Sequence, residues 1–114
     1  MNEKLAQTLK LVPTLSGCYI YYDINDEVIY VGKAKNLKRR VYSYFHKKHD
    51  SVKVAVLVSN IERMEYIITD SEVEALILES HLIKKYKPKY NILLKDDKKY
   101  PYFLITDEKY PRIT

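Results

Sequence analysis

A β-hairpin is encoded by residues 17–32, whose sequence is GCYIYYDINDEVIYVG. Aromatic and β-branched residues fill 17–22 and 28–31, which is typical of strands, and the Asn-Asp pair between them suits a tight turn. If the two runs pair antiparallel, Tyr19 and Tyr30 lie close to each other across the strands, and alternation can place both on one face of the sheet. Their rings then either pack in the core or present hydroxyls at a site.

Further elements are predicted on both sides of the hairpin. Gly32 is expected to end the second strand, and the Lys33 that follows suggests that the backbone there approaches something anionic. Apolar spacing predicts helices over 3–11, from 37 to about 45 behind a cap at Asn36, over 52–61 behind Asp50-Ser51, and from a capping box at 71–74 to about Tyr86. A third strand is expected over 64–69, and short strands or extended loops over 90–94 and 102–106.

These elements predict an α+β fold in which a small three-stranded antiparallel sheet is flanked by helices. The length of 114 residues is enough for one core only, so 1–114 is expected to be a single domain. The chain stops directly after a strand-like run, at Tyr110-Pro111-Arg112-Ile113-Thr114. We therefore expect an N-terminal fragment of a longer protein.

Several classes of protein are excluded by composition. The single cysteine, Cys18, excludes an internal disulfide framework, and no Cys/His cluster has the spacing of a zinc site. No apolar run approaches the roughly 18 residues that a membrane helix needs, and the N-terminus lacks the features of a signal peptide. A cytoplasmic protein without a membrane partner is expected.

Basic residues are concentrated in two segments that flank an acidic one. Residues 33–48 contain seven basic and no acidic residues, and 84–99 contain seven basic and two acidic, whereas 49–83 contain two basic and seven acidic. The basic segments also carry tyrosine, phenylalanine or asparagine, a composition typical of surfaces that contact phosphates. The alternative is a solvated, lysine-rich helix face.

Glu79 is a carboxylate on the apolar side of its predicted helix. At about 100° per residue, it falls inside an arc formed by Leu78, Leu82, Ala75, Tyr86, Ile83 and Leu76. An unpaired buried charge costs several kcal/mol, so this carboxylate needs an arginine, a lysine or a metal ion beside it. The structural alternatives are a buried ion pair, for example with Arg40, and a position at the solvent edge of the helix.

Five motifs occur in order along the chain. They are Gly17-Cys18-Tyr19, Tyr30-Val31-Gly32, the run KAKNLKRR at 33–40, Ile77-Leu78-Glu79 and the run KPKYN at 87–91. In this combination, from about Leu11 to Thr106, the chain resembles the GIY-YIG nuclease superfamily, and within it the N-terminal endonuclease domain of the UvrC family of the bacterial excinuclease ABC system. The middle of the first motif is usually Ile or Val in that family. Cys18 departs from it, but is expected to face away from the site as a small hydrophobe.

The resemblance implies a set of site residues. They are Tyr19, Tyr30, Lys33, Arg40, Tyr44, Glu79 and Asn91, with Glu79 as the ligand of one divalent cation, Mg²⁺ or Mn²⁺. Arg39 leaves the arginine ambiguous by one residue, and the family spacing after Gly32 favours Arg40. Tyr30 is the implied general base, although whether it or Tyr19 takes the proton stays open. The expected contacts with nucleic acid are made by Lys33, Lys35, Lys38, Arg39, Arg40 and Lys89.

The implied reaction is metal-dependent hydrolysis of a phosphodiester in damaged duplex DNA, the 3′ incision of nucleotide excision repair. The implied partner is UvrB, the damage-loading component of the excinuclease ABC system, which acts through the full-length protein. The basic segments alone would also fit a nucleic-acid-binding module without activity. Only an enzyme requires the carboxylate of Glu79, which therefore discriminates between the two.

Overall fold

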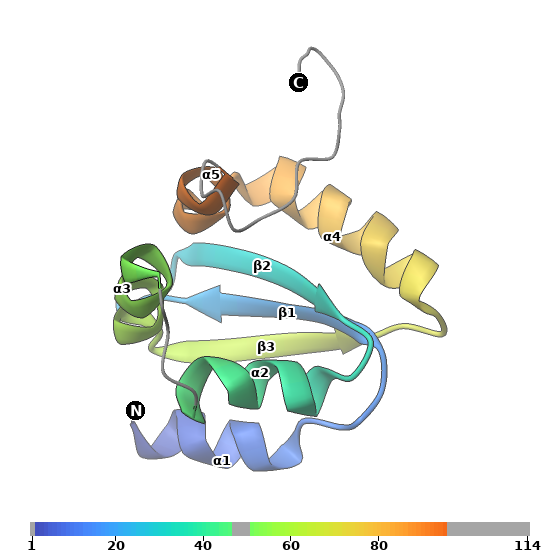
Figure 1. Cartoon of the computed structure of the whole chain (residues 1–114), viewed down its shortest axis with the longest axis horizontal. Helices are drawn as coiled ribbons and strands as arrows, with labels where there is room; N and C mark the ends of the chain where they lie inside the picture. The colour runs from blue at the N-terminus through green and yellow to red at the C-terminus, as the bar shows by residue number, and fades with distance from the viewer. Residues whose placement is uncertain (1, 47–50, 96–114) are drawn as a thin grey trace.

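The structure is a computed structural model that describes residues 2–46 and 51–95. The described residues form a three-stranded antiparallel sheet and five helices, which confirms the predicted α+β class (Figure 1). In chain order the elements are α1 (Glu3–Leu11), β1 (Gly17–Tyr22), β2 (Val28–Ala34), α2 (Leu37–His46), α3 (Val52–Asn60), β3 (Arg63–Ile68), α4 (Glu72–Tyr86) and α5 (Lys89–Lys95).

The strands are arranged in the order β2-β1-β3, so the hairpin provides the centre and one edge of the sheet. β1 pairs antiparallel with both neighbours, and Tyr19 lies opposite Gly32 while Tyr21 lies opposite Tyr30. Tyr19 and Tyr30 are therefore diagonal rather than direct partners, but alternation places them on the same face, as the sequence predicts.

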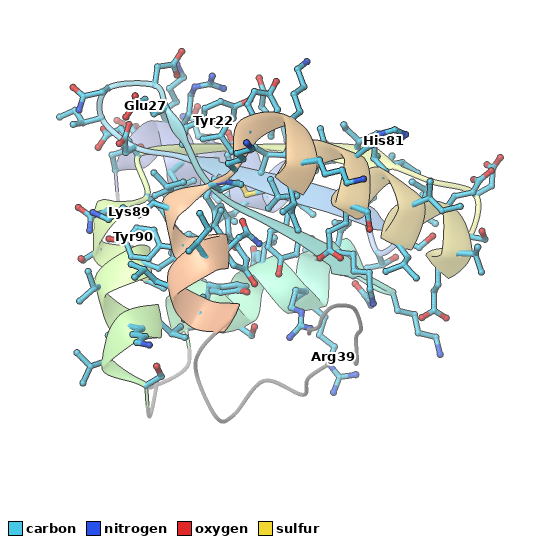
Figure 2. All side chains as sticks on the ribbon, turned by 90° about the horizontal axis from the view of Figure 1, so that it is seen from above. Tyr22, Glu27, Arg39, His81, Lys89 and Tyr90 are labelled. Carbon is cyan, nitrogen blue, oxygen red and sulfur yellow. The ribbon has the colours of Figure 1, made fainter. Side chains whose placement is uncertain are left out.

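The two faces of the sheet are covered differently. On the tyrosine face, Tyr19, Tyr21 and Tyr30 pack with the buried side chains of α1 and α2, among them Leu5, Leu9, Leu37 and Val41. α4 lies on the opposite side of the sheet from α2 (Figure 2). There the Sγ of Cys18 donates a hydrogen bond to the carbonyl of Ala75 at 3.1 Å.

Side chains cap the helices where the sequence predicts them. The Asn36 side chain accepts a hydrogen bond from the backbone N–H of Arg39 at 3.1 Å. Two more N–H groups at the start of α2 donate to the carbonyls of Leu15 and Pro13, so this helix end is anchored on the preceding loop. At α3 the side chain of Ser51 is the cap; Asp50 lies outside the described residues.

The buried face of α4 is smaller than its apolar residues predict. Ser71 caps the helix, and the Glu74 carboxylate accepts from the N–H of Asp70 rather than from that of Ser71. Of its residues only Ala75 is fully buried, and Leu76 and Tyr86 are 48% and 41% exposed. The predicted arc is wrong for these two because α4 packs mainly against β2 and β1, which leaves both side chains exposed.

Two predictions near the ends of elements are wrong. Residues 90–94 belong to the helix α5, in which Tyr90 and Leu94 are buried one turn apart; Pro88 precedes it, and its carbonyl accepts from the N–H groups of Asn91 and Ile92. β2 also continues through Gly32 to Ala34, because its pairing with β1 extends to Gly17. The strand expected over 102–106 lies outside the described residues.

Candidate active site

The outer edge of β2, on the side away from β1, pairs with no strand among the described residues and is covered by side chains instead. The side chain of Asn91, from α5, accepts from the N–H of Val31 at 2.8 Å and donates to the carbonyl of the same residue at 2.9 Å. Two residues along the strand, the N–H of Lys33 faces the carboxylate of Glu79, from α4, closely enough to lower the pKa of this carboxyl. The hydrogen bonds of Asn91 satisfy backbone groups that a sheet edge otherwise leaves unpaired, and Glu79 and Asn91 lie along the same edge.

Glu79 is half-buried, so it lies at the edge of the core rather than inside it. Burial raises the pKa of its carboxyl above the ordinary 4.5, and the charge of Lys33, the Lys33 N–H and the charge of Arg40 oppose this increase. Of the alternatives left open by the sequence, the structure supports the solvent edge, with two cations nearby. No salt bridge to Glu79 is formed within the described residues.

A cluster of tyrosines occupies the tyrosine face beside this edge. The hydroxyls of Tyr19 and Tyr44 are hydrogen-bonded at 2.9 Å, and the ring centroids of Tyr19 and Tyr30 are 6.3 Å apart, as are those of Tyr30 and Tyr44. Tyr19 also lies directly over Gly32, where an added Cβ would come within 2.3 Å of its ring. Gly32 therefore makes room for Tyr19, and its expected role in approaching an anion is not needed to explain it.

The environment of Tyr19 keeps its hydroxyl protonated. Its side chain is 1% exposed. Burial, with Tyr30 and Tyr21 adding to it, raises the pKa of this phenol well above 10, whereas Arg40 and the Tyr44 hydrogen bond lower it by less. A phenol in this state donates hydrogen bonds and does not accept a proton at neutral pH.

Tyr21 is a member of the cluster that the sequence does not single out. Its ring stacks on Tyr30, with centroids 6.2 Å apart and planes at 23°, and meets Tyr44 edge-on. Its buried hydroxyl has no hydrogen-bond partner among the described residues. The alternation along β1 was the available signal, since it places Tyr21 on the face of Tyr19.

The first basic segment surrounds a cavity of about 910 Å³ along α2. Five of the six residues expected to bind nucleic acid line it: Lys33, Lys35, Lys38, Arg39 and Arg40. Lys89 does not line it; it lies on α5, with its ammonium 5.5 Å from the ring centroid of Tyr90, away from Arg39 in Figure 2. Arg39 projects outward from α2 in that view. The sequence did not single out Thr14, Tyr42, Ser43, His46 and Glu72, which also line the cavity.

Of the two neighbouring arginines, Arg40 is the one whose charge influences the pKa of other residues in the site. Its charge lowers the pKa of Glu79 and those of the buried Tyr19 and Tyr21. Consecutive helical residues point about 100° apart, so Arg39 cannot take the same position. The geometry thus favours Arg40 over Arg39, in agreement with the assignment made from spacing.

Cys18 faces away from the tyrosines, towards α4. Burial, together with the charge of Glu79, raises the pKa of its thiol to about 11, so it is inert at neutral pH. Nowhere in 2–46 and 51–95 do three or more His, Cys, Asp or Glu side chains form a metal-binding group. A cation at Glu79 would therefore have fewer than three such side chains as ligands among these residues, which suits a metal that retains most of its water.

None of the helices in the described ranges is long and apolar enough to cross a membrane.

Comparison with known sequences identifies close relatives. The chain is 58% identical over 113 residues to UvrABC system protein C of Streptococcus sanguinis (strain SK36), and 58% identical over 113 residues to that of Streptococcus mutans serotype c. These matches cover 99% of this chain but 18% and 19% of the relatives. The chain therefore spans about a fifth of the length of these proteins.

Solved structures agree with this relationship. The GIY-YIG N-terminal endonuclease domain of UvrC from Thermotoga maritima, bound to its catalytic divalent cation magnesium, superposes with a TM-score of 0.71 at 41% identity. The match covers 80% of this chain and 99% of that domain. A point mutant of the same domain, also bound to its catalytic divalent cation, matches at 40% identity with a TM-score of 0.71, covering 80% of this chain and 98% of that one.

The family described as the UvrC-like GIY-YIG domain matches residues 15–92, which include the hairpin, α2, α4 and the start of α5. With the sequence identity to full UvrABC system protein C relatives and the agreement in fold, the chain belongs to the UvrC-like GIY-YIG family.

Proposed function

We propose that this chain is a metal-dependent DNA endonuclease domain that hydrolyses a phosphodiester in damaged duplex DNA, as the 3′ incision of nucleotide excision repair. One observation carries the proposal: a half-buried carboxylate, Glu79, lies at the β2 edge near the charges of Arg40 and Lys33, which also line a basic cavity. The relatives named UvrABC system protein C and the magnesium-bound endonuclease domain from Thermotoga maritima support it.

Glu79 is the residue that would hold the cation, Mg²⁺ or Mn²⁺. Mg²⁺ is commonly bound through one or two carboxylates and substrate oxygens while it keeps several waters, so a carboxylate near Lys33 and Arg40, which line the cavity, fits it. When bound, such a cation stabilises the charge that develops on the leaving oxygen. The N–H of Lys33 faces this carboxylate and favours its charged form.

Arg40 would bind the scissile phosphate. A guanidinium forms paired, charge-assisted hydrogen bonds with phosphate oxygens, and the transition state gathers charge on these oxygens. Arg40 lies close enough to Glu79 and to Tyr19 to influence the pKa of each. A phosphate at this arginine would therefore lie between the carboxylate and the tyrosines.

The tyrosines would divide the work of hydrogen bonding and proton transfer. Because the pKa of Tyr19 is raised by burial, we assign Tyr19 as a donor that, with Tyr44, orients phosphate or water. Tyr30 then takes the proton from the attacking water as the general base. Asn91 acts through β2, because both hydrogen bonds of its side chain hold the backbone of Val31.

DNA binding would rely on the backbone of the duplex. Lysines and arginines around the cavity grip phosphates without reading sequence, so recognition of damage is assigned to UvrB, the excinuclease ABC partner that acts with the full-length protein. Lys89 would contact DNA only outside the cavity. We place this activity in the cytoplasm.

The proposal is tested by replacing Glu79 in a working repair protein. This chain is exchanged for the matching segment of the Streptococcus sanguinis relative, to which it is 58% identical, and incision of a damaged duplex is measured with UvrB and Mg²⁺. Glu79→Gln should lower the 3′ incision rate at least about 100-fold, in line with the loss of an essential electrostatic group. Glu27→Gln, which changes an exposed glutamate in the turn between β1 and β2 that does not line the cavity, is the matched control.

A binding module without activity is the second candidate, and the basic cavity favours it. It predicts salt-sensitive DNA binding that needs no metal, and no incision by the exchanged protein even with Glu79 intact. Unchanged incision by a folded Glu79→Gln variant would remove Glu79 from the mechanism.

A further inference from the structure

A ladder of side chains on α2 borders the basic cavity, and its two rings have no part in the mechanism above. The rings of Tyr42 and His46 are stacked, with centroids 4.9 Å apart and planes at 26°, and the Lys38 ammonium lies 5.9 Å from the Tyr42 centroid. All three residues line the same cavity as Lys33 and Arg40.

The two rings are held in place before any ligand binds. Tyr42 is partly buried and packs against the core, and the Nδ1 of His46 lies 3.1 Å from the Tyr42 carbonyl. With Nδ1 donating to that carbonyl, the Nε2 edge of the exposed imidazole stays available. Rings that are already ordered lose little conformational entropy when a ligand stacks on them.

The ladder lies on the same helix as Arg40, the residue proposed to bind the phosphate. Arg40 and His46 are six residues apart on α2, which corresponds to about 9 Å along the axis at 1.5 Å per residue. At about 100° per residue, Tyr42 and His46 lie about 160° and 120° around α2 from Arg40, so a strand whose phosphate is held at Arg40 reaches the rings along the cavity that all three residues line. Cations flank the rings, and aromatic rings in a basic groove are the combination that binds single strands, because every base has a face that stacks.

We propose that Tyr42 and His46 form a stacking site for one unpaired base within the cavity that Arg40 also lines, so that the strand entering the site is single-stranded or locally melted on that side. Paired bases in a duplex have their faces covered by neighbouring bases and cannot stack on these rings. The inference rests on the proposed function, since it takes the phosphate at Arg40 as its reference.

The test measures binding alone, in EDTA, so that it does not depend on cleavage. Single-stranded 12-mers with 2-aminopurine at successive positions are titrated with the 114-residue chain, and a second set carries an abasic residue at each position. We expect one position to change its fluorescence on binding, and an abasic residue there to weaken binding about tenfold, within the range measured for one base–aromatic stack. Tyr42→Leu, which retains apolar packing, should remove both effects.

Two controls separate stacking from charge and from folding. Tyr86→Leu removes a partly exposed tyrosine outside the cavity and should leave binding unchanged. Lys38→Ala should reduce the dependence of binding on salt, whereas Tyr42→Leu should not, because only the lysine contacts phosphate. Circular dichroism of each variant checks the fold.

Three results would overturn the stacking site: position-specific fluorescence retained in folded Tyr42→Leu, duplex bound at least as tightly as single strand, or no binding of the 12-mers. This assay contains no metal ion and measures no cleavage. A failure of the proposed function would therefore appear in the incision assay with Glu79→Gln, and a failure of the stacking site would appear in this binding assay.

Discussion

At Gly32 the second strand of the hairpin has no room for a side chain, because the ring of Tyr19 lies over the backbone. Gly32→Ala would place a Cβ 2.3 Å from the Tyr19 ring, so the ring must move away from Tyr44. We expect the free energy of unfolding to fall by about 1–3 kcal/mol, the usual cost of overpacking, as measured by urea denaturation. In a Tyr19→Leu background, Gly32→Ala should lower the free energy of unfolding by less. An equal decrease in both backgrounds would rule out the contact with Tyr19 as the cause.

The hydroxyl of Tyr21, which has no hydrogen-bond partner among residues 2–46 and 51–95, has the opposite effect on stability. An unpaired buried polar group costs about 1–3 kcal/mol, so Tyr21→Phe should raise the free energy of unfolding by about 1 kcal/mol. Tyr19→Phe should lower it, because it removes the 2.9 Å bond to Tyr44. Thermal denaturation of the two variants side by side checks the contrast; a destabilised Tyr21→Phe would show that this hydroxyl is paired in solution.

Glu79 should reduce stability at neutral pH. Burial raises the pKa of its carboxyl above 4.5, so the folded state holds the proton more tightly than the unfolded state. The stability gained from the protonated form is present below 4.5 and is lost as pH rises through the raised pKa. In EDTA, Glu79→Gln should therefore match the wild type near pH 4 and exceed it at pH 7, by thermal denaturation. A variant less stable than the wild type at pH 7 would show that pairing with Lys33 and Arg40 outweighs burial.

Individual site residues were predictable to different degrees. Glu79 stood out because a charge interrupts an apolar arc, and the structure leaves it half-buried, where the charges of Lys33 and Arg40 influence its pKa. The side-chain contacts of Tyr21 and Asn91 depend on register and on a helix that arrives from later in the chain. Local sequence patterns do not contain this information.

At the scale of elements, α5 closes the sheet edge that supports the site. Asn91→Ala removes both hydrogen bonds to Val31, and two lost bonds of this kind should lower the free energy of unfolding by about 1–3 kcal/mol. The amide of Val31 should also exchange with solvent faster, which hydrogen exchange by NMR measures. Asn25→Ala, in the turn between β1 and β2, is the control; unchanged protection of Val31 in Asn91→Ala would contradict this role.

The elements with strong local signals were predicted correctly. The hairpin, the caps at Asn36, Ser51 and Ser71 and the third strand all follow from turn residues, caps and alternation. α5 was not predicted because its short apolar run fits a strand as well as a helix, and the packing of Tyr90 and Leu94 decides between them.

At the scale of the whole molecule, only one of the two basic segments found in the sequence contributes described residues to the cavity. The first basic segment lines the cavity, whereas no described residue of 84–99 does. Charge counts along the chain cannot show which segments share a face, because this depends on how α2 and α4 are placed across the sheet. The central claim is therefore a geometric one: the carboxylate of Glu79, at the β2 edge, lies near enough to Arg40 for the charge of the arginine to lower its pKa.

The most direct test is to locate a bound cation. Crystals of the 114-residue chain would be soaked in Mn²⁺, and an anomalous difference map collected for the wild type and for Glu79→Gln. We predict one strong peak beside the Glu79 carboxylate, next to the cavity lined by Lys33 and Arg40, and its loss in the variant. A peak away from Glu79, or one that persists in Glu79→Gln, would contradict the proposed site.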